Sequence, residues 1–332
     1  MVTLEDFTRQ SPYSDPGRHA ALLGALPAGL ASVCAASRNV IAHYRAELSD
    51  LSASRWDEVD SRWLEVVLEV DQRRHGTGLQ QPRAPGERVA GCCRDHALLV
   101  VAALRQRGVP ARSRVGFAHY FTAGFAHDHV VVEFWWQGRW RRADPELGTG
   151  RGAVEGSAAA SVATFDVHDI PTGAATDGAS GAVLGAPTSA ATSGVIGAPA
   201  PFETAAQAWL GWRSGQRDAS RYGVVPGSPW CGAGFVRDEV LYEVAHRFGD
   251  ELLLWDGWGA LEDPAALREG EVDELARLLL LADGGDAAAE ADLAAWYRGD
   301  ERLHPGESVI TRSPFGGPAR VVELAGGSRA VS

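Results

Sequence analysis

The sequence predicts an α+β fold, in which a helix that begins with a cysteine packs on an antiparallel sheet and further helices flank this core along the chain. Three observations support the prediction. Apolar residues recur at helical spacing over residues 1–75 and again over residues 202–300. A single helix is expected from Cys93 to Gly108. Strand-like composition follows it over residues 112–144.

The first 75 residues are expected to be mainly helical. Two apolar stripes have helical spacing, and both are interpreted as surfaces that face a core: Leu22, Leu23, Leu26 and Leu30, then Val59, Trp63, Val66, Val67 and Val70. Residues 76–90 are rich in Gly, Gln, Pro and Arg, which is typical of a loop.

The next helix is expected to begin at Cys93 and to end at Gly108 and Pro110, which are stop signals in the right order. Its apolar face repeats at helical spacing: Ala97, Leu98, Val101 and Leu104. A helix N-terminus carries a partial positive charge and unpaired amide groups, and both favour a thiolate over a thiol. The sequence therefore predicts that Cys93 is activated and alkylates rapidly at or below neutral pH. The alternative is a small buried cysteine that only packs.

A strand is expected over residues 112–117, and a hairpin follows over residues 128–144 with Gln137-Gly138 at its tip. With a two-residue turn, Asp144 lies opposite Val131. His129 is then diagonal to Asp144 on the same face of the hairpin, within the roughly 5–8 Å reach of such neighbours. A carboxylate beside an imidazole fixes its tautomer and stabilises its charged form, as in nucleophile–base–acid triads.

Three segments resemble blocks of the transglutaminase-like superfamily. They are Gly91-Cys-Cys-Arg-Asp-His-Ala97 with Gly108-Val-Pro-Ala-Arg112, then His129-Val-Val-Val-Glu133, then Trp140-Arg-Arg-Ala-Asp144-Pro145. The resemblance covers about residues 88–146 and implies a papain-like core. It implies that Cys93 is the nucleophile, His129 the general base and acid, and Asp144 the carboxylate that orients the histidine. No cofactor is expected.

Composition narrows the classes of partner. The 332 residues carry a formal net charge of −12, and every basic side chain is Arg. This charge argues against a nucleic-acid-binding protein and against docking on an anionic membrane. The absence of Lys excludes a lysine Schiff base and a lysine general base. Sparse cysteines, a first segment without the features of a secretory signal, and no apolar run of membrane-spanning length predict a cytoplasmic protein.

Three parts are expected along the chain. Residues 1–150 hold the N-terminal helices and the catalytic core. Residues 151–201 are dominated by Gly, Ala, Ser and Thr and are expected to form a linker or mobile loop, in which residues 165–171 are apolar enough to dock on the core. Residues 202–332 are expected to form a mainly helical region that packs on the core.

Several other residues are weaker candidates for the site. Gln81 is a candidate oxyanion donor, Tyr120 could line the mouth of the site, and Trp135 shares the predicted catalytic face. Trp255 begins the cluster Trp255-Asp-Gly-Trp-Gly259, which either caps the site or packs between elements. Cys92 is expected to pack rather than react, because neighbours on a helix point about 100° apart.

Together these residues predict covalent acyl transfer through a thioester on Cys93, which water or an amine then resolves. Hydrolysis of an amide or peptide-like bond is favoured. One alternative is an amine-accepting acyltransferase that forms an amide on a small molecule. An alternative of another class is a catalytically idle binding module with the same fold. A zinc site formed by Cys93, His127, His129 and Asp144 is a further alternative, although the chain has no Cys-x-x-Cys pair.

Overall fold

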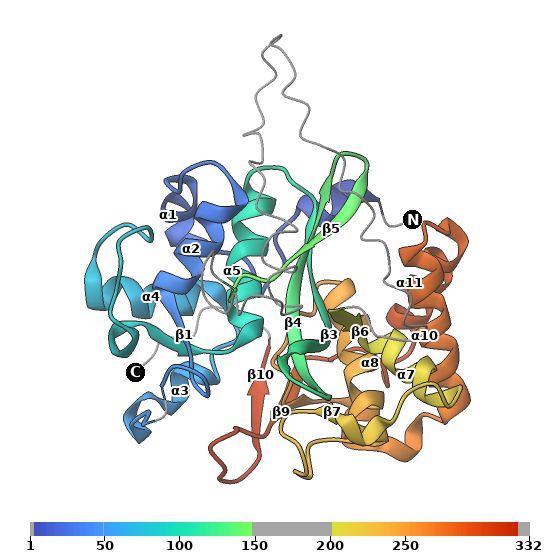
Figure 1. Cartoon of the computed structure of the whole chain (residues 1–332). Coiled ribbons are helices and arrows are strands. Elements are labelled where there is room, and N and C mark those ends of the chain that lie inside the picture. The colour runs from blue at the N-terminus through green and yellow to red at the C-terminus, as the bar shows by residue number, and fades with distance from the viewer. Residues whose placement is uncertain (1–2, 49, 148–200, 325–332) are drawn as a thin grey trace.

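A computed structural model describes residues 3–48, 50–147 and 201–324 (Figure 1). The expected linker, residues 151–201, lies outside the described residues apart from Pro201, and so does its segment 165–171. Helices and a curled antiparallel sheet make up the described chain, which confirms the predicted α+β class.

Short helices form most of the N-terminal part. They are η1 (Leu4–Thr8), η2 (Gly17–His19), α1 (Ala20–Gly24), α2 (Leu30–Val40), η3 (Ala53–Arg55), α3 (Trp56–Val59), α4 (Leu64–His75) and η4 (Pro85–Glu87). Each predicted stripe is divided between two helices. Gly29, with a φ of 103°, precedes α2 and separates it from α1. A strand that the sequence did not predict, β1 (Ile41–His43), pairs in parallel with β2 (Val89–Gly91), which ends the predicted loop.

The central helix, α5 (Cys93–Gln106), begins at the predicted residue. Cys92 is its N-cap, and the Cys92 N–H donates to Asp95 Oδ2 at 2.9 Å. Gly91 makes this contact possible, because a Cβ at that position would lie 2.7 Å from the same oxygen. Every residue from Cys93 to Arg105 is buried, and α5 packs on the two longest strands.

The sheet has the strand order β5-β4-β3-β6, with β7 beside β4. Its strands are β3 (Ala111–Thr122), β4 (Phe125–Trp136), β5 (Arg139–Ala143), β6 (Phe202–Thr204) and β7 (Tyr222–Gly223). Gln137 and Gly138 both have positive φ, 50° and 78°, as a two-residue hairpin turn of type I′ requires. The pairing of Trp135 with Trp140 confirms the predicted hairpin register.

The C-terminal part supplies two strands of this sheet and most of the remaining helices. Its other elements are α7 (Ala205–Arg213), η5 (Ala219–Arg221), α8 (Ala233–Arg247), β8 (Asp256–Gly257), α9 (Gly259–Glu262), η6 (Pro264–Ala266), α10 (Glu269–Asp283), α11 (Ala287–Gly299), β9 (Ser308–Thr311) and β10 (Arg320–Glu323). In Figure 1, α7, α8, α10 and α11 lie across the sheet from α1, α2 and α4, and α8 packs on β3. No helix in the described part of the chain is long and apolar enough to cross a membrane.

A buried network of charges joins the sheet to the C-terminal helices. Glu133, on β4, accepts hydrogen bonds from Arg112 at 2.8 Å, Arg114 at 2.8 Å and Arg142 at 2.7 Å. Arg114 also donates to Glu243 of α8 at 2.7 Å and to Asp283 of α10 at 2.6 Å. Charges this deep are tolerated only when they are paired, so the network fixes where the helices dock.

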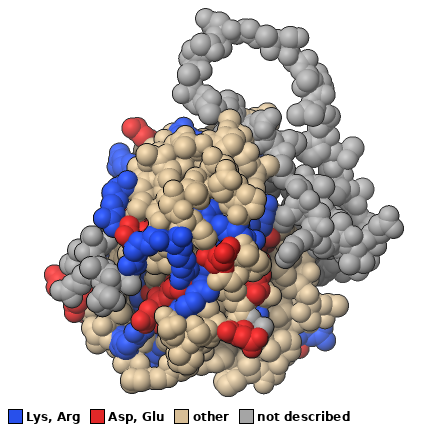
Figure 2. Space-filling view, turned by 90° about the vertical axis from the view of Figure 1, so that its left-hand side faces the viewer, with Lys and Arg blue, Asp and Glu red and all other residues tan. Residues whose placement is uncertain are grey.

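Unlike the buried network, the charges on the surface form exposed pairs. Figure 2 shows Arg side chains interleaved with acidic ones on the face formed by the N-terminal helices. Arg18 pairs with Glu69 on this surface at 2.7 Å. Exposed pairs of this kind contribute little to stability.

Replacing Glu133 with Gln should lower the free energy of unfolding by about 3–5 kcal/mol, because the two buried guanidinium groups of Arg112 and Arg114 lose a shared counter-charge. Denaturant unfolding measures the change. Glu274→Gln is the matched control, since Glu274 forms an exposed pair with Arg277, and it should cost less than about 0.5 kcal/mol. Equal losses in the two variants would contradict a stabilising role for the buried network.

Candidate active site

His129 and Asp144 form a buried pair on the sheet. His129 Nε2 lies 2.8 Å from Asp144 Oδ2, and the two side chains are 3% and 1% exposed. Strand β4 positions His129, and Asp144 directly follows the last residue of β5. Two further donors hold the carboxylate: the Tyr120 hydroxyl donates to Oδ2 at 2.5 Å, and the Glu146 N–H donates to Oδ1 at 2.9 Å.

Both members of this pair are charged at neutral pH. Burial opposes the charge on His129, but the Asp144 carboxylate and its hydrogen bond outweigh burial and raise the pKa of His129 to about 9. Burial likewise opposes ionisation of Asp144, yet His129 and the hydrogen bonds to the carboxylate lower its pKa. Since Nε2 of His129 is held by Asp144, Nδ1 is the atom that remains for proton transfer.

Cys93 is the first residue of α5 and is 7% exposed. A hydrogen bond with the Cys92 thiol, burial, and the negative charge of Glu146 raise the pKa of Cys93 well above its ordinary value. These neighbours oppose the effect of the helix N-terminus, so the structure does not support the expectation that Cys93 is a thiolate at neutral pH. We expected the Cys92 and Cys93 side chains to point apart, because neighbouring residues on a helix do so. In the structure Cys92 is an N-cap residue with an extended backbone, and its thiol contacts that of Cys93.

The three predicted catalytic residues are brought together to different degrees. His129 and Asp144 are hydrogen-bonded. Cys93 lies close enough to Tyr120 for its charge to raise the pKa of the Tyr120 hydroxyl, although burial and Asp144 raise it more. Between the described side chains of Cys93 and His129 there is no hydrogen bond. Cys93 is thus a neighbour of the His129–Asp144 pair without being joined to it.

The weaker candidates lie at different places. Tyr120 is part of the site, and its ring stands edge-on to that of His129 with 6.2 Å between centroids. Trp135 packs on Trp140, toward the turn of the β4–β5 hairpin. Trp255 donates from Nε1 to Asp60 at 2.9 Å. It also borders the small apolar cluster that holds Cys92. Gln81 is exposed, and its carbonyl accepts a hydrogen bond from Arg83.

Residues 42–145 match the sequence profile of the transglutaminase-like superfamily. This segment is a transglutaminase-like domain. No curated protein matches the chain. A similar solved structure is that of a "putative cysteine protease" from Cytophaga hutchinsonii, with 21% sequence identity and a TM-score of 0.28. The match covers 42% of this chain and 40% of that protein, so it spans less than half of either.

The transglutaminase-like domain contains a histidine at the site that the sequence did not indicate, His43. Parallel pairing of β1 and β2 sets His43 opposite Gly91, two residues before Cys93. His43 Nδ1 accepts the Arg45 N–H at 3.2 Å, so the ring proton lies on Nε2. Burial lowers the pKa of His43 to about 4, which leaves a neutral N–H donor near the nucleophile. A three-residue strand has too little alternation to be recognised in a sequence.

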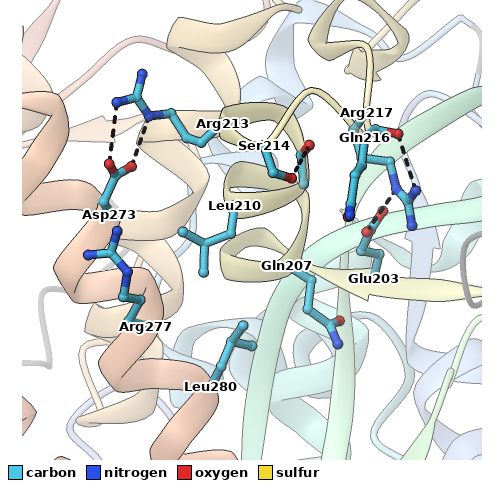
Figure 3. Close-up of a pocket in the computed structure, with 11 residues that line it drawn as sticks. Glu203, Gln207, Leu210, Arg213, Ser214, Gln216, Arg217, Asp273, Arg277 and Leu280 are labelled. Atoms are coloured by element: carbon cyan, nitrogen blue, oxygen red, sulfur yellow. Dashed lines mark hydrogen bonds and ion pairs between the residues drawn. The ribbon is translucent and has the colours of Figure 1, made fainter.

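Two cavities border the sheet or its helices. The larger, of about 690 Å³, lies between α7 and α10 and holds none of the predicted site residues (Figure 3). Its Arg213 and Arg217 are paired with Asp273 and Glu203. The smaller, of about 480 Å³, is lined by Tyr120 and Asp144 among others. Within the described chain, no group of three or more His, Cys, Asp or Glu side chains is placed to hold a metal ion, so the zinc alternative has no ligand set there.

Replacing Cys92 with Ala should let Cys93 alkylate at lower pH, because it removes the hydrogen-bonding neighbour that contributes most to the raised pKa of Cys93. Iodoacetamide labelling across pH, with the labelled peptide identified by mass spectrometry, measures the shift. In the unmodified protein the midpoint should lie above the ordinary thiol value of about 8.5. Cys231→Ala is the control and should leave the Cys93 profile unchanged. An unchanged profile in Cys92→Ala would mean that burial alone holds the proton.

Proposed function

We propose that this protein is a cysteine-dependent acyl-transfer enzyme that forms a thioester on Cys93 and hydrolyses an amide or peptide-like bond. The observation that carries the proposal is the buried His129–Asp144 ion pair in a transglutaminase-like domain whose central helix begins with Cys93. A buried ion pair is a poor way to stabilise a core, because desolvation offsets most of its attraction. Strongly perturbed ionisable groups gather instead at functional sites.

Before acylation, both Cys93 and His129 are protonated. At neutral pH Cys93 is a thiol and His129 an imidazolium, so the reactive state forms when the pair loses one proton. Because the pKa of Cys93 lies above that of His129, the proton lost is that of His129, and the population of neutral His129 grows as pH rises toward about 9. Nδ1 of the neutral imidazole then takes the Cys93 proton, which gives a thiolate beside an imidazolium. The sulfur then bonds to the substrate carbonyl carbon. The imidazolium protonates the leaving nitrogen as the C–N bond breaks, which leaves a thioester on Cys93 and a neutral His129.

The oxyanion formed during acylation needs two donors. One is the Cys93 N–H, which has no partner within the helix because it lies in the first turn of α5. The other is the Nε2–H of His43, whose tautomer is fixed by the Arg45 N–H. This assignment replaces Gln81, which is exposed on the loop before β2. A neutral imidazole is a suitable donor here, because it binds the developing charge without titrating.

Two other functions fit parts of the same site. An amine-accepting acyltransferase would use the same acylation step and differ only in the group that resolves the thioester. A binding module would need neither the raised pKa of His129 nor the carboxylate that causes it, so the ion pair favours an enzyme.

Reaction with p-nitrophenyl acetate tests the proposal. The protein should release a burst of nitrophenol, carry an acetyl group on Cys93 that mass spectrometry locates, and acylate faster as pH rises toward about 9. Cys93→Ala should lower the rate by at least about 10⁴-fold. Adding a primary amine separates hydrolysis from amide formation through the products.

Two outcomes would contradict this assignment. An adduct on Cys92 in the Cys93→Ala variant would show that the nucleophile is the neighbouring cysteine. No adduct with any of several activated esters would favour the binding module.

Replacing His43 with Ala should slow acylation by about 10²-fold, the usual loss when one oxyanion donor is removed. The burst rate measures this loss, and the pH at which it is half-maximal should not move. His75→Ala removes a histidine at the end of α4 and should leave the burst rate unchanged. A normal burst rate in His43→Ala would exclude His43 from the oxyanion site.

A further inference from the structure

His96 and Glu146 form a buried polar pair whose side-chain atoms are not used by the steps described above. His96 is 1% exposed, and neither of its ring nitrogens has a hydrogen-bond partner. Glu146 Oε1 is also buried without a partner and lies 3.8 Å from His96 Nε2. This distance is too long for a direct hydrogen bond. Since buried polar atoms are nearly always paired, the unpaired Nε2 of His96 and Oε1 of Glu146, which face each other across this gap, indicate a bound molecule.

His96 is a neighbour of the nucleophile on α5, and Glu146 is a neighbour of the acid–base pair. His96 follows Cys93 by three residues on α5, so the two side chains are neighbours on the helix surface. Glu146 donates its backbone N–H to Asp144 and is close enough to Cys93 to raise the pKa of the thiol. A molecule held by His96 and Glu146 therefore sits beside the sulfur that carries the acyl group.

The chemistry of the two groups selects the molecule. Burial lowers the pKa of His96 to about 3 and raises that of Glu146 to about 8, so both are neutral at pH 7. A neutral imidazole accepts a hydrogen bond through one nitrogen, and a carboxylic acid can donate one. One water, with bonds of roughly 2.8 Å to each group, spans a gap of this size. Neither group carries a charge that would attract an ion.

We propose that His96 and Glu146 bind one water molecule, and that this water resolves the thioester on Cys93. The inference rests on the proposed function and assigns its second half. The water oxygen bonds to the acyl carbon and gives a proton to Nδ1 of His129, which is neutral after acylation. The C–S bond then breaks, the acid product leaves, and the thiolate beside the imidazolium is restored. His96 and Glu146 are positioning residues in this step, because they act through the water.

The matched variants are His96→Leu, which removes the water acceptor, and Glu146→Gln, which keeps a neutral donor of the same shape. Reaction with p-nitrophenyl acetate separates acylation, read from the burst, from deacylation, read from the steady-state rate. His96→Leu should keep the burst and lower the steady-state rate by about 10²-fold, so that acetylated Cys93 accumulates. Hydroxylamine, a strong nucleophile that does not need the water site, should restore turnover. Glu146→Gln should retain the burst and slow deacylation less than Glu146→Leu does, because its amide still donates to the water. His75→Leu, at the end of α4, is the control and should change neither rate.

The outcomes distinguish a failure of the proposed function from a failure of the water site. A missing burst in the unmodified protein overturns the proposed function itself. A normal burst with an unchanged steady-state rate in His96→Leu overturns only the water site, and so does loss of the burst in a folded His96→Leu protein. If His96→Leu does not fold, Glu146→Leu decides: a retained burst with slowed deacylation supports the site, and unchanged turnover overturns it.

Discussion

The Asp144 carboxylate is the contact on which the rest of the site depends. It accepts hydrogen bonds from His129 on β4, from Tyr120 near the end of β3 and from the N–H of Glu146. Three segments of chain are therefore fixed to one another by one side chain. The carboxylate reaches this place because the Gln137-Gly138 turn sets the hairpin register. A slip of one residue would turn Asp144 to the other face and leave His129 buried without a counter-charge.

The same carboxylate sets the protonation of its surroundings. Asp144 keeps His129 charged, whereas burial keeps Glu146, His96 and His43 neutral at pH 7. Cys93 adds no charge at rest. A helix N-terminus offers about half a unit of positive charge, whereas burial and an adjacent thiol act on this cysteine in the opposite direction and raise its pKa. Cys93 is therefore a protonated thiol in the resting site and becomes a thiolate only during the reaction.

Features with local causes could be predicted from the sequence. The start of α5 at Cys93 and the register of the hairpin follow from stop signals, alternation and turn residues within a few positions. Tyr120 was expected only to line the mouth of the site. Its contact with Asp144 could not be predicted, because the register of the β3–β4 pairing shifts between Ala118 and Thr122 and no sequence feature indicates this shift.

Features that depend on chain segments meeting in space could not be predicted. His43 reaches the site through a three-residue strand, and Glu146 through the path of the chain after Asp144. The raised pKa of Cys93 was missed because the contact between the Cys92 and Cys93 thiols depends on the extended backbone of the N-cap residue, which the sequence does not indicate.

The buried charge network has a consequence for the order of folding. Arg112 and Arg114 are 21 and 19 residues from Glu133 along the chain, but their other partners, Glu243 and Asp283, are more than a hundred residues away. Contacts of such long range close late, since loop entropy must first be overcome. Until α8 and α10 dock, Arg112, Arg114 and Arg142 share the single carboxylate of Glu133. The transglutaminase-like domain is consequently a part of a larger cooperative unit, and cutting the chain after β5 would yield a fragment with unbalanced positive charge where its partner helices belong.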